Sequence, residues 1–174
     1  GLSLVLGACE VTMWELAGYY ASLARILNHD DKNKARIDLN DIHSPKYFDD
    51  QPVKKFKQAN FPIDATSLYF TFRSMQEVMR PGEEGLWQMF SSSQQIAWKT
   101  GTSFGFRDGW AVGVTPKHVV AVWVGNADGE GRAGLIGVQT AAPLMFDIFR
   151  LLPTVSFFKK PETRFSYLPV CRTS

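Results

Sequence analysis

Apolar residues recur at helical spacing in two parts of the chain. In the first, apolar side chains from Met13 to Leu27 fall on one face, and Glu15 stands three residues after Thr12, as in a capping box. In the second, the apolar positions of one face are Leu68, Phe72, Met75 and Met79. A Pro-Gly pair after this run ends the pattern. The spacing therefore predicts two amphipathic helices in the first half of the chain.

The second half contains three runs rich in β-branched and aromatic residues. They are Gln95 to Ser103, Gly109 to Thr115 and His118 to Gly125. Only Pro116 and Lys117 separate the last two runs, a connection short enough for an antiparallel hairpin alone. The pattern predicts a three-stranded antiparallel meander.

A third helix is predicted after the strands. It begins near Gln139, continues through a run of apolar residues and stops before Pro153. From residue 30 to 61 the chain is polar and shows no sustained period, which predicts loops with one short strand around 35–39. Helices together with an antiparallel sheet predict an α+β fold.

Charge and the spacing of cysteines and histidines disfavour nucleic-acid binding and a zinc site. The chain has 174 residues, of which 45% are hydrophobic and 21% charged, and its formal charge is +2 with basic residues scattered. This balance gives no support to nucleic-acid binding. The cysteines, Cys9 and Cys171, lack the spacing of a zinc site, and so do His29, His43 and His118. We therefore expect no metal site.

Two further patterns invite a functional interpretation that the context disfavours. The GEGRAG segment at 129–134 matches a dinucleotide-binding pattern, but it follows an antiparallel strand and precedes the predicted helix by five residues. Each predicted strand also carries one tryptophan, at Trp98, Trp110 and Trp123. We expect these rings to fill the core face of the sheet.

The segment Lys99-Thr100-Gly101-Thr102-Ser103 carries the clearest candidate chemistry. Strand alternation puts Thr100 and Thr102 on one face, and the missing side chain at Gly101 lets a ligand lie close to the backbone. Two hydroxyls beside the Lys99 cation suit a carboxylate. An unpaired strand edge can add a peptide, and the amide of Thr102 is placed to donate to an oxyanion. The pattern predicts one wall of an acyl-transfer site.

The surrounding sequence resembles the penicillin-binding proteins, the serine D,D-transpeptidases that cross-link peptidoglycan and are acylated by β-lactams. IAWKTGTSFGFRDGWAVGVTPKHVVAVWVGN is similar to the third motif and following hairpin of that family. LSLVLGACEVTMWELAGYYASLA resembles the segment between its second and third motifs. SMQEVMRPGEEGLW and the closing PETRFSYLPVCRTS resemble the bifunctional class A branch of type 1C.

The resemblance implies roles for the KTG residues. Lys99 would contribute positive charge and proton traffic toward a serine nucleophile, and Thr100 and Thr102 would hold the terminal carboxylate of a D-Ala-D-Ala stem peptide or a β-lactam. The amide of Thr102 would complete the oxyanion hole. The resemblance implies no organic cofactor. It also implies the fold of the serine β-lactamases and D,D-peptidases, with the three strands as the third, fourth and fifth of an antiparallel sheet covered by helices on both faces.

The sequence departs from the family pattern before Lys99. The family needs an SxxK segment and then an SxN triad upstream of KTG, and neither stands there. The one SxxK match, at Ser156 to Lys159, follows the KTG and is interpreted as chance. We expect residues 1–152 to be the C-terminal half of a transpeptidase domain, inactive alone, and 153–174 to be a linker into a further domain.

Two other function classes stay open. A D,D-carboxypeptidase or β-lactamase uses the same three motifs, and a non-catalytic protein-interaction module would need no nucleophile.

For the transpeptidase, the expected partners are the peptidoglycan stem peptide and β-lactams. The parent protein is expected to be membrane-anchored on the periplasmic side of the inner membrane, in the cell envelope. The resemblance also implies that the outer edge of the strand at 118–125 pairs in the family with a strand from the start of the domain. We expect that edge to be covered here by a neighbouring chain, through self-association, or by the C-terminal tail.

Overall fold

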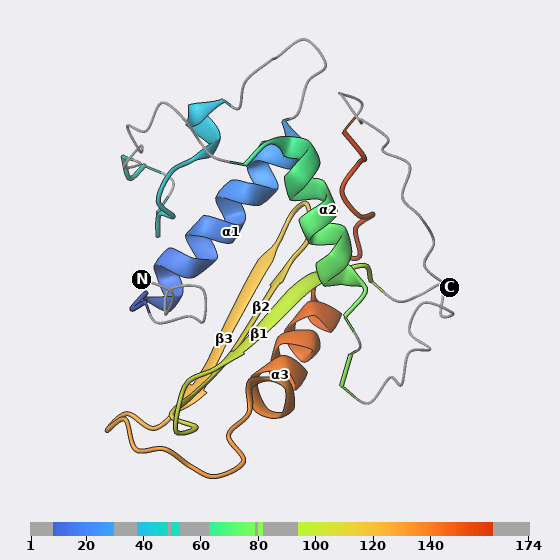
Figure 1. Cartoon of the computed structure of the whole chain (residues 1–174). Helices are drawn as coiled ribbons and strands as arrows, with labels where there is room; N and C mark the ends of the chain where they lie inside the picture. Colours follow the sequence, from blue (N-terminus) through green and yellow to red (C-terminus); the bar gives the residue numbers. More distant parts are fainter. Residues whose placement is uncertain are drawn as a thin grey trace, which may run out of the picture.

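The structure is a computed structural model. It describes residues 9–29, 38–48, 50–52, 63–78, 80–81 and 94–161. Within these ranges the elements are α1 (Met13–Asn28), a 3-10 turn η2 (Leu39–Asp41), α2 (Ala65–Gln76), β1 (Ala97–Thr102), β2 (Asp108–Val114), β3 (Val119–Gly125) and α3 (Gly137–Leu151). The three strands form one sheet with helices on both of its faces (Figure 1). The predicted α+β class is confirmed.

The first predicted helix begins where its capping box indicates. The Thr12 hydroxyl accepts a hydrogen bond from the Glu15 amide at 3.2 Å, and the Glu15 carboxylate accepts one from the Thr12 amide at 3.1 Å. These two bonds satisfy amides that have no partner inside the helix. The start of α1 is therefore set by local sequence alone.

The other two helices differ from their predicted bounds. α2 ends at Gln76, three residues before Met79, because the chain leaves the helix to pass over the sheet, where the Val78 carbonyl accepts the Trp98 indole N–H at 3.3 Å. α3 begins at Gly137 rather than Gln139, because its first amide finds an acceptor on another element, described below. Both corrections come from tertiary contacts.

The predicted strand at 35–39 lies mostly outside the described residues. Its last residue, Leu39, begins the η2 turn, which runs to Asp41. The amide of Asp41 donates to the Asp38 carbonyl at 3.0 Å, and the Asp38 carboxylate accepts the Asn40 amide at 2.9 Å. A short polar side chain that bonds the backbone two residues on favours a turn over a strand.

The predicted antiparallel meander is confirmed, with strand order β1-β2-β3. The first hairpin closes where the Ser103 amide donates to the Asp108 carbonyl at 3.0 Å. The second closes where the Thr115 amide donates to the His118 carbonyl at 2.9 Å. These two closing pairs set the register of every residue in the sheet.

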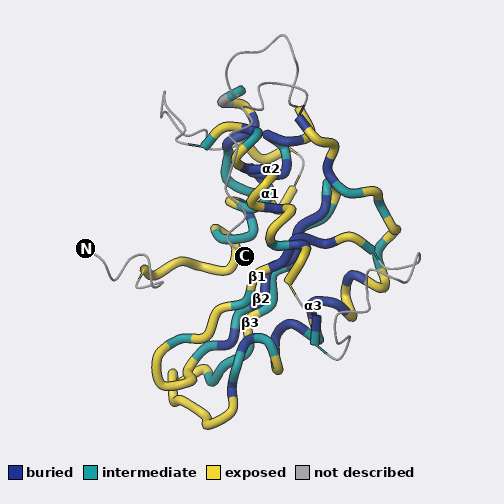
Figure 2. The backbone as a smooth tube through the Cα atoms, turned by 45° about the vertical axis from the view of Figure 1, so that its right-hand side comes forward, coloured by how far each residue is buried: buried dark blue, intermediate teal, exposed yellow. Residues whose placement is uncertain are grey.

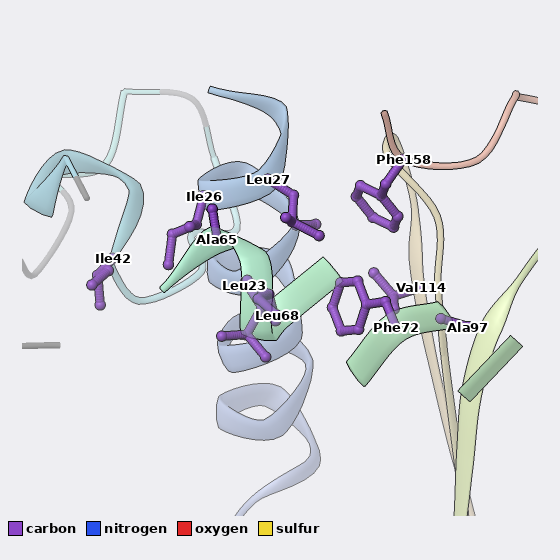
Figure 3. Close-up of a cluster of buried hydrophobic side chains, with 11 residues drawn as sticks. Leu23, Ile26, Leu27, Ile42, Ala65, Leu68, Phe72, Ala97, Val114 and Phe158 are labelled. Atoms are coloured by element: carbon purple, nitrogen blue, oxygen red, sulfur yellow. The ribbon is translucent and has the colours of Figure 1, made fainter. Parts of the chain in front are cut away.

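Apolar side chains cover each face of the sheet with a separate core. One face packs against α1 and α2 and contributes Ala97 and Val114 to a cluster with Phe72, which Figure 3 shows between α2 and the strands. The opposite face packs against α3 and contributes Trp98 and Ala111. Figure 2 shows this burial along the strands and the exposed loops at one end of the sheet.

α3 lies close to β2 because Gly113 has no side chain. A β-carbon built there would lie 2.5 Å from a ring carbon of Phe149 and 2.9 Å from the sulfur of Met145. Both of these side chains are fully buried, so neither has room to move away. The predicted helix therefore packs directly on the sheet, as expected.

The segment after α3 contacts the body of the domain. Phe158 is buried and belongs to the cluster between α2 and the sheet, with its ring centroid 5.2 Å from that of Phe72. The segment is therefore attached to the fold through Phe158, while the domain boundary at 152 and the linker stay predictions. No helix in the described part of the chain is long and apolar enough to cross a membrane.

Replacing Phe158 by alanine tests this packing. We expect Phe158→Ala to lower the free energy of unfolding by about 3 to 5 kcal/mol, because it removes a buried ring and leaves a cavity beside Phe72. Urea denaturation followed by circular dichroism measures the change. The control is Lys159→Ala, an exposed neighbour that should leave stability within about 0.5 kcal/mol. Equal midpoints for the two variants would show that the segment does not support the core.

Candidate functional site

One edge of β1 has no neighbouring strand among the described residues. In an antiparallel pair, residues alternate between those bonded to the partner strand and those whose backbone groups point outward. Ser103 is bonded to Asp108, so the alternation directs the amide and carbonyl groups of Thr102, Thr100 and Trp98 away from β2. This free edge of β1 therefore offers backbone donors and acceptors to an added peptide.

The Lys99 side chain starts on the face of the sheet that packs against α1 and α2, and its ammonium group reaches the free edge of β1. It is exposed, and Lys99 is opposite Val112. The ammonium group bends over the strand edge and donates to the Thr100 carbonyl oxygen at 2.6 Å. The cation and the outward backbone groups thus meet at the free edge.

Thr100 and Thr102 share the α3 face, as predicted from strand alternation. Thr102 is exposed, and its hydroxyl oxygen accepts a hydrogen bond from the Gly137 amide at 3.0 Å. The Ser103 hydroxyl accepts from the Asp108 amide at 2.8 Å, inside the hairpin. Thr102 therefore faces outward, whereas the Ser103 hydroxyl supports the turn.

Gly101 is exposed, and packing does not demand a glycine there. A β-carbon at this position would meet only Trp110, at an ordinary contact distance of 3.6 Å, and Gly101 is not among the positive-φ glycines. An alanine would fit the folded chain. The open space over Gly101 is thus available to a ligand that lies close to the strand.

The hairpin beyond the free edge carries exposed aromatic rings. Phe104 is 100% exposed at its tip, and Phe106 adopts a left-handed backbone with φ of 56°. The Phe106 carbonyl accepts the Arg132 amide at 3.0 Å, which ties the hairpin to the glycine-rich loop after β3. This contact gives GEGRAG a structural role, and the loop lies between an antiparallel strand and α3.

The prediction that all three strand tryptophans fill one core face is wrong. Trp98 is 1% exposed and packs under α3, 5.0 Å between ring centroids from Phe146. Trp110 and Trp123 are cross-strand partners on the opposite face, and Trp123 is 39% exposed. Its indole N–H donates to the Asp108 carboxylate at 2.8 Å. Trp98 is opposite Gly113, and Trp110 lies three positions from Gly113 along β2, so strand alternation puts the two rings on opposite faces.

Two of the three histidines, His29 and His43, contact structural partners. A ring nitrogen of His29 contacts the Asp41 carboxylate, and one of His43 lies 2.8 Å from the Ser44 carbonyl oxygen. No cluster of three metal-ligating side chains occurs in the part of the chain that the structure describes. Ser156 and Lys159 are exposed in an irregular segment, without the helical turn that brings an SxxK pair together.

Sequence reasoning missed Gly137. The residue opens α3 and its amide contacts Thr102, although 35 positions separate the two. A glycine at the start of a helix is common for local reasons, so no periodicity links it to the strand. The available signal was the absence of a capping side chain at Ile136, which leaves the first amides of the helix in need of a distant acceptor.

Comparison with known proteins gives several related sequences. The chain is 28% identical over 151 residues to penicillin-binding protein 1C of Escherichia coli (strain K12). The matched region covers 87% of the chain and 17% of that protein. The chain is 33% identical over 176 residues to penicillin-binding protein 1A of Neisseria flavescens, covering 92% of the chain and 20% of that protein. Penicillin-binding protein 1B of Buchnera aphidicola subsp. Baizongia pistaciae (strain Bp) is 28% identical over 124 residues, 71% of the chain and 16% of that protein.

The chain spans about a fifth of the length of these relatives. No family model matches it, and no solved structure matches it. The relatives carry the names 1A, 1B and 1C, and the resemblance noted in the sequence was to the class A branch that includes type 1C. That resemblance is confirmed: the chain is homologous to the class A penicillin-binding proteins over most of its length.

Proposed function

We propose that the chain forms the KTG wall of a serine D,D-transpeptidase site that cross-links peptidoglycan stem peptides. The observation that carries the proposal is the free edge of β1, where the Lys99 ammonium group, the outward amide of Thr102 and an exposed threonine hydroxyl lie together. Homology to penicillin-binding proteins supports the same assignment. The intact protein would be a cell-envelope enzyme, anchored in the membrane with this domain on the periplasmic side.

Each residue of the wall has a role in acyl transfer. The terminal D-Ala-D-Ala segment adds to β1 as an extended strand, and Thr100 and Thr102 bind its carboxylate. The Thr102 amide donates to the carbonyl oxygen of the D-alanine that is attacked, where negative charge develops in the transition state. Lys99 supplies positive charge and proton traffic toward the serine. Because hydrogen bonds to ionised groups are the stronger ones, the carboxylate orients the substrate.

The serine nucleophile lies outside these 174 residues. No SxxK precedes Lys99, and no SxN or YxN triad occurs in the chain. The serine attacks the penultimate D-alanyl carbonyl, forms an acyl-enzyme and releases D-alanine, and the amine of a second stem peptide then displaces the serine. We assign these steps to a polypeptide that joins this chain to the SxxK and SxN half of the domain. No metal or organic cofactor takes part in this scheme.

A D,D-carboxypeptidase or β-lactamase is the second candidate, because water in place of the amine turns the same acyl-enzyme toward hydrolysis. Homology to proteins named penicillin-binding proteins 1A, 1B and 1C favours the transpeptidase. The hydrolase is distinguished by its product: with a stem peptide and an amine acceptor, a transpeptidase forms a new peptide bond, whereas a carboxypeptidase releases only free acid.

Labelling with a fluorescent penicillin tests whether this chain supplies only the KTG wall while another segment supplies the serine. The 174-residue chain should give no labelled band on a denaturing gel, because loss of the nucleophile lowers such a reaction by about a million-fold. In the joined polypeptide labelling should return. There, Lys99→Ala should reduce the acylation rate by about 100-fold or more, and Thr102→Val should weaken labelling by about tenfold through poorer carboxylate binding.

Ser156→Ala is the control for this experiment. Because Ser156 is exposed in an irregular segment, its removal should change labelling in neither polypeptide. A labelled band from the 174-residue chain that disappears in Ser156→Ala would overturn the assignment of the nucleophile to another segment.

Two glycine substitutions separate binding from stability. Gly101→Ala should leave the unfolding midpoint unchanged or slightly raised, since its β-carbon has space, while labelling of the joined polypeptide falls about tenfold. Gly113→Ala should lower the free energy of unfolding by about 1 to 3 kcal/mol, because its β-carbon overlaps Phe149. Thermal denaturation and the penicillin gel measure the two effects. Equal labelling by Gly101→Ala and the unsubstituted polypeptide would show that no ligand lies against the Gly101 side of this strand.

We also propose that the outer edge of β3 pairs with another strand, supplied in the isolated chain by a second copy. No fourth strand pairs with β3 among the described residues, and the alternation set by Thr115 and His118 directs the backbone groups of Val119, Ala121 and Trp123 outward. Apolar, unpaired edges associate readily.

Light scattering at increasing concentration should therefore reveal dimers of the isolated chain. Ala121→Pro should shift the equilibrium to monomer, because proline removes an outward amide without breaking a bond to β2. Ala127→Pro is the matched control, since it lies in an exposed turn where proline is tolerated. A chain that stays monomeric at every concentration would count against association through this edge.

A further inference from the structure

α3 begins without a cap from its own neighbourhood. Ile136 occupies the N-cap position and its side chain makes no capping hydrogen bond. The hydroxyl of Thr102, on β1, accepts the amide of Gly137 instead, at 3.0 Å. A residue of the candidate site thus takes the place that a local serine, threonine or aspartate usually fills.

Gly137 is the residue that allows this contact. A β-carbon at position 137 would clash with the carbonyl oxygen of Gly101 and lie 2.7 Å from that of Trp110. Both neighbours are backbone atoms of paired strands, so they cannot rotate away. Gly109, which is opposite Thr102 on β2, also leaves space for the helix start, since its β-carbon would lie 2.8 Å from the hydroxyl oxygen of Thr140. Any larger residue at 137 would move the helix start away from Thr102.

The bond to Gly137 determines what the Thr102 hydroxyl can still do. A hydroxyl has one hydrogen to donate and two lone pairs to accept with. Because the Gly137 amide occupies a lone pair, the hydrogen is directed elsewhere, and the exposed side chain presents it to an incoming group. The first turn of α3 also carries partial positive charge, which favours an anion beside Thr102.

From these contacts we infer that Gly137 is a positioning residue, which orients the Thr102 hydroxyl to donate to the carboxylate of an acyl-D-alanyl-D-alanine terminus at the free edge of β1. The inference rests on the proposed function and adds a residue to it. Ligand binding would then change the electronic environment of the Gly137 amide through the Thr102 hydroxyl oxygen, although this amide does not contact the ligand.

Amide NMR of the 174-residue chain tests the inference, with N-acetyl-D-alanyl-D-alanine added to millimolar concentration. We expect the amide signals of both Thr102 and Gly137 to shift. The control ligand is the same dipeptide with a C-terminal carboxamide, which lacks the carboxylate and should move neither signal comparably. A role confined to capping the helix would leave the Gly137 signal unchanged by either ligand.

Two substitutions at Thr102 separate the hydroxyl from the shape of the side chain. Thr102→Ser keeps the hydroxyl and should retain the ligand-dependent shift at Gly137. Thr102→Val keeps the shape and should abolish that shift and weaken binding by about tenfold. A Gly137 shift that persists in Thr102→Val would overturn the inference. Shifts at Thr100 and Thr102 without one at Gly137 would overturn the inference and leave the proposed function intact. No response anywhere would also overturn the inference, whereas the proposed function is decided by labelling of the joined polypeptide.

Discussion

The hydrogen bond between the Ser103 amide and the Asp108 carbonyl fixes the pairing of β1 with β2, and the rest of the structure depends on that register. Side chains in a strand alternate between faces, and backbone groups alternate between edges. With this register, the outward amide of the β1 edge belongs to Thr102 and the apolar partners of α3 are Trp98 and Ala111. A slip by one residue would expose the core positions and turn the Thr102 amide toward β2.

The sheet works as a partition between two cores of different origin. The core under α3 is built from residues close in sequence, since α3 directly follows the strands it covers. The other core gathers α1, α2 and the segment containing Phe158, which come from both ends of the chain. The strand that bears the KTG residues is anchored in both cores at its first end, through Ala97 on one face and Trp98 on the other. Rigid elements hold catalytic geometry better than loops.

Local chemistry made much of this fold predictable. The capping box at Thr12, the two-residue connection before His118 and the apolar periodicity of α2 each act over a few residues, and each prediction is confirmed at its centre. The errors arose where contacts between distant elements decide. α2 stops early where Val78 meets Trp98, and Trp123 lies on the opposite face from Trp98, where it is 39% exposed.

The features of the candidate site also fall into those that local sequence predicts and those that depend on contacts between distant elements. The side-chain types at Lys99, Thr100 and Thr102 and their alternation could be predicted from the sequence, because a strand has a fixed period. The bend of Lys99 to the Thr100 carbonyl and the role of Gly137 could not, because neither contact follows from spacing alone. The penicillin-binding relatives identify the family. The structure identifies the free edge of β1 as the place where the proposed acyl transfer would occur.

The cap that Thr102 gives to α3 also bears on the order in which the chain folds. Helix nucleation is costly, and a helix start without a local cap frays in the unfolded chain. The first turn of α3 gains its acceptor only after β1 and β2 have paired, across a separation of 35 residues. Local opening of that turn releases the Thr102 hydroxyl at the same moment. The geometry of the site therefore depends on two elements together, the paired strand β1 and the first turn of α3.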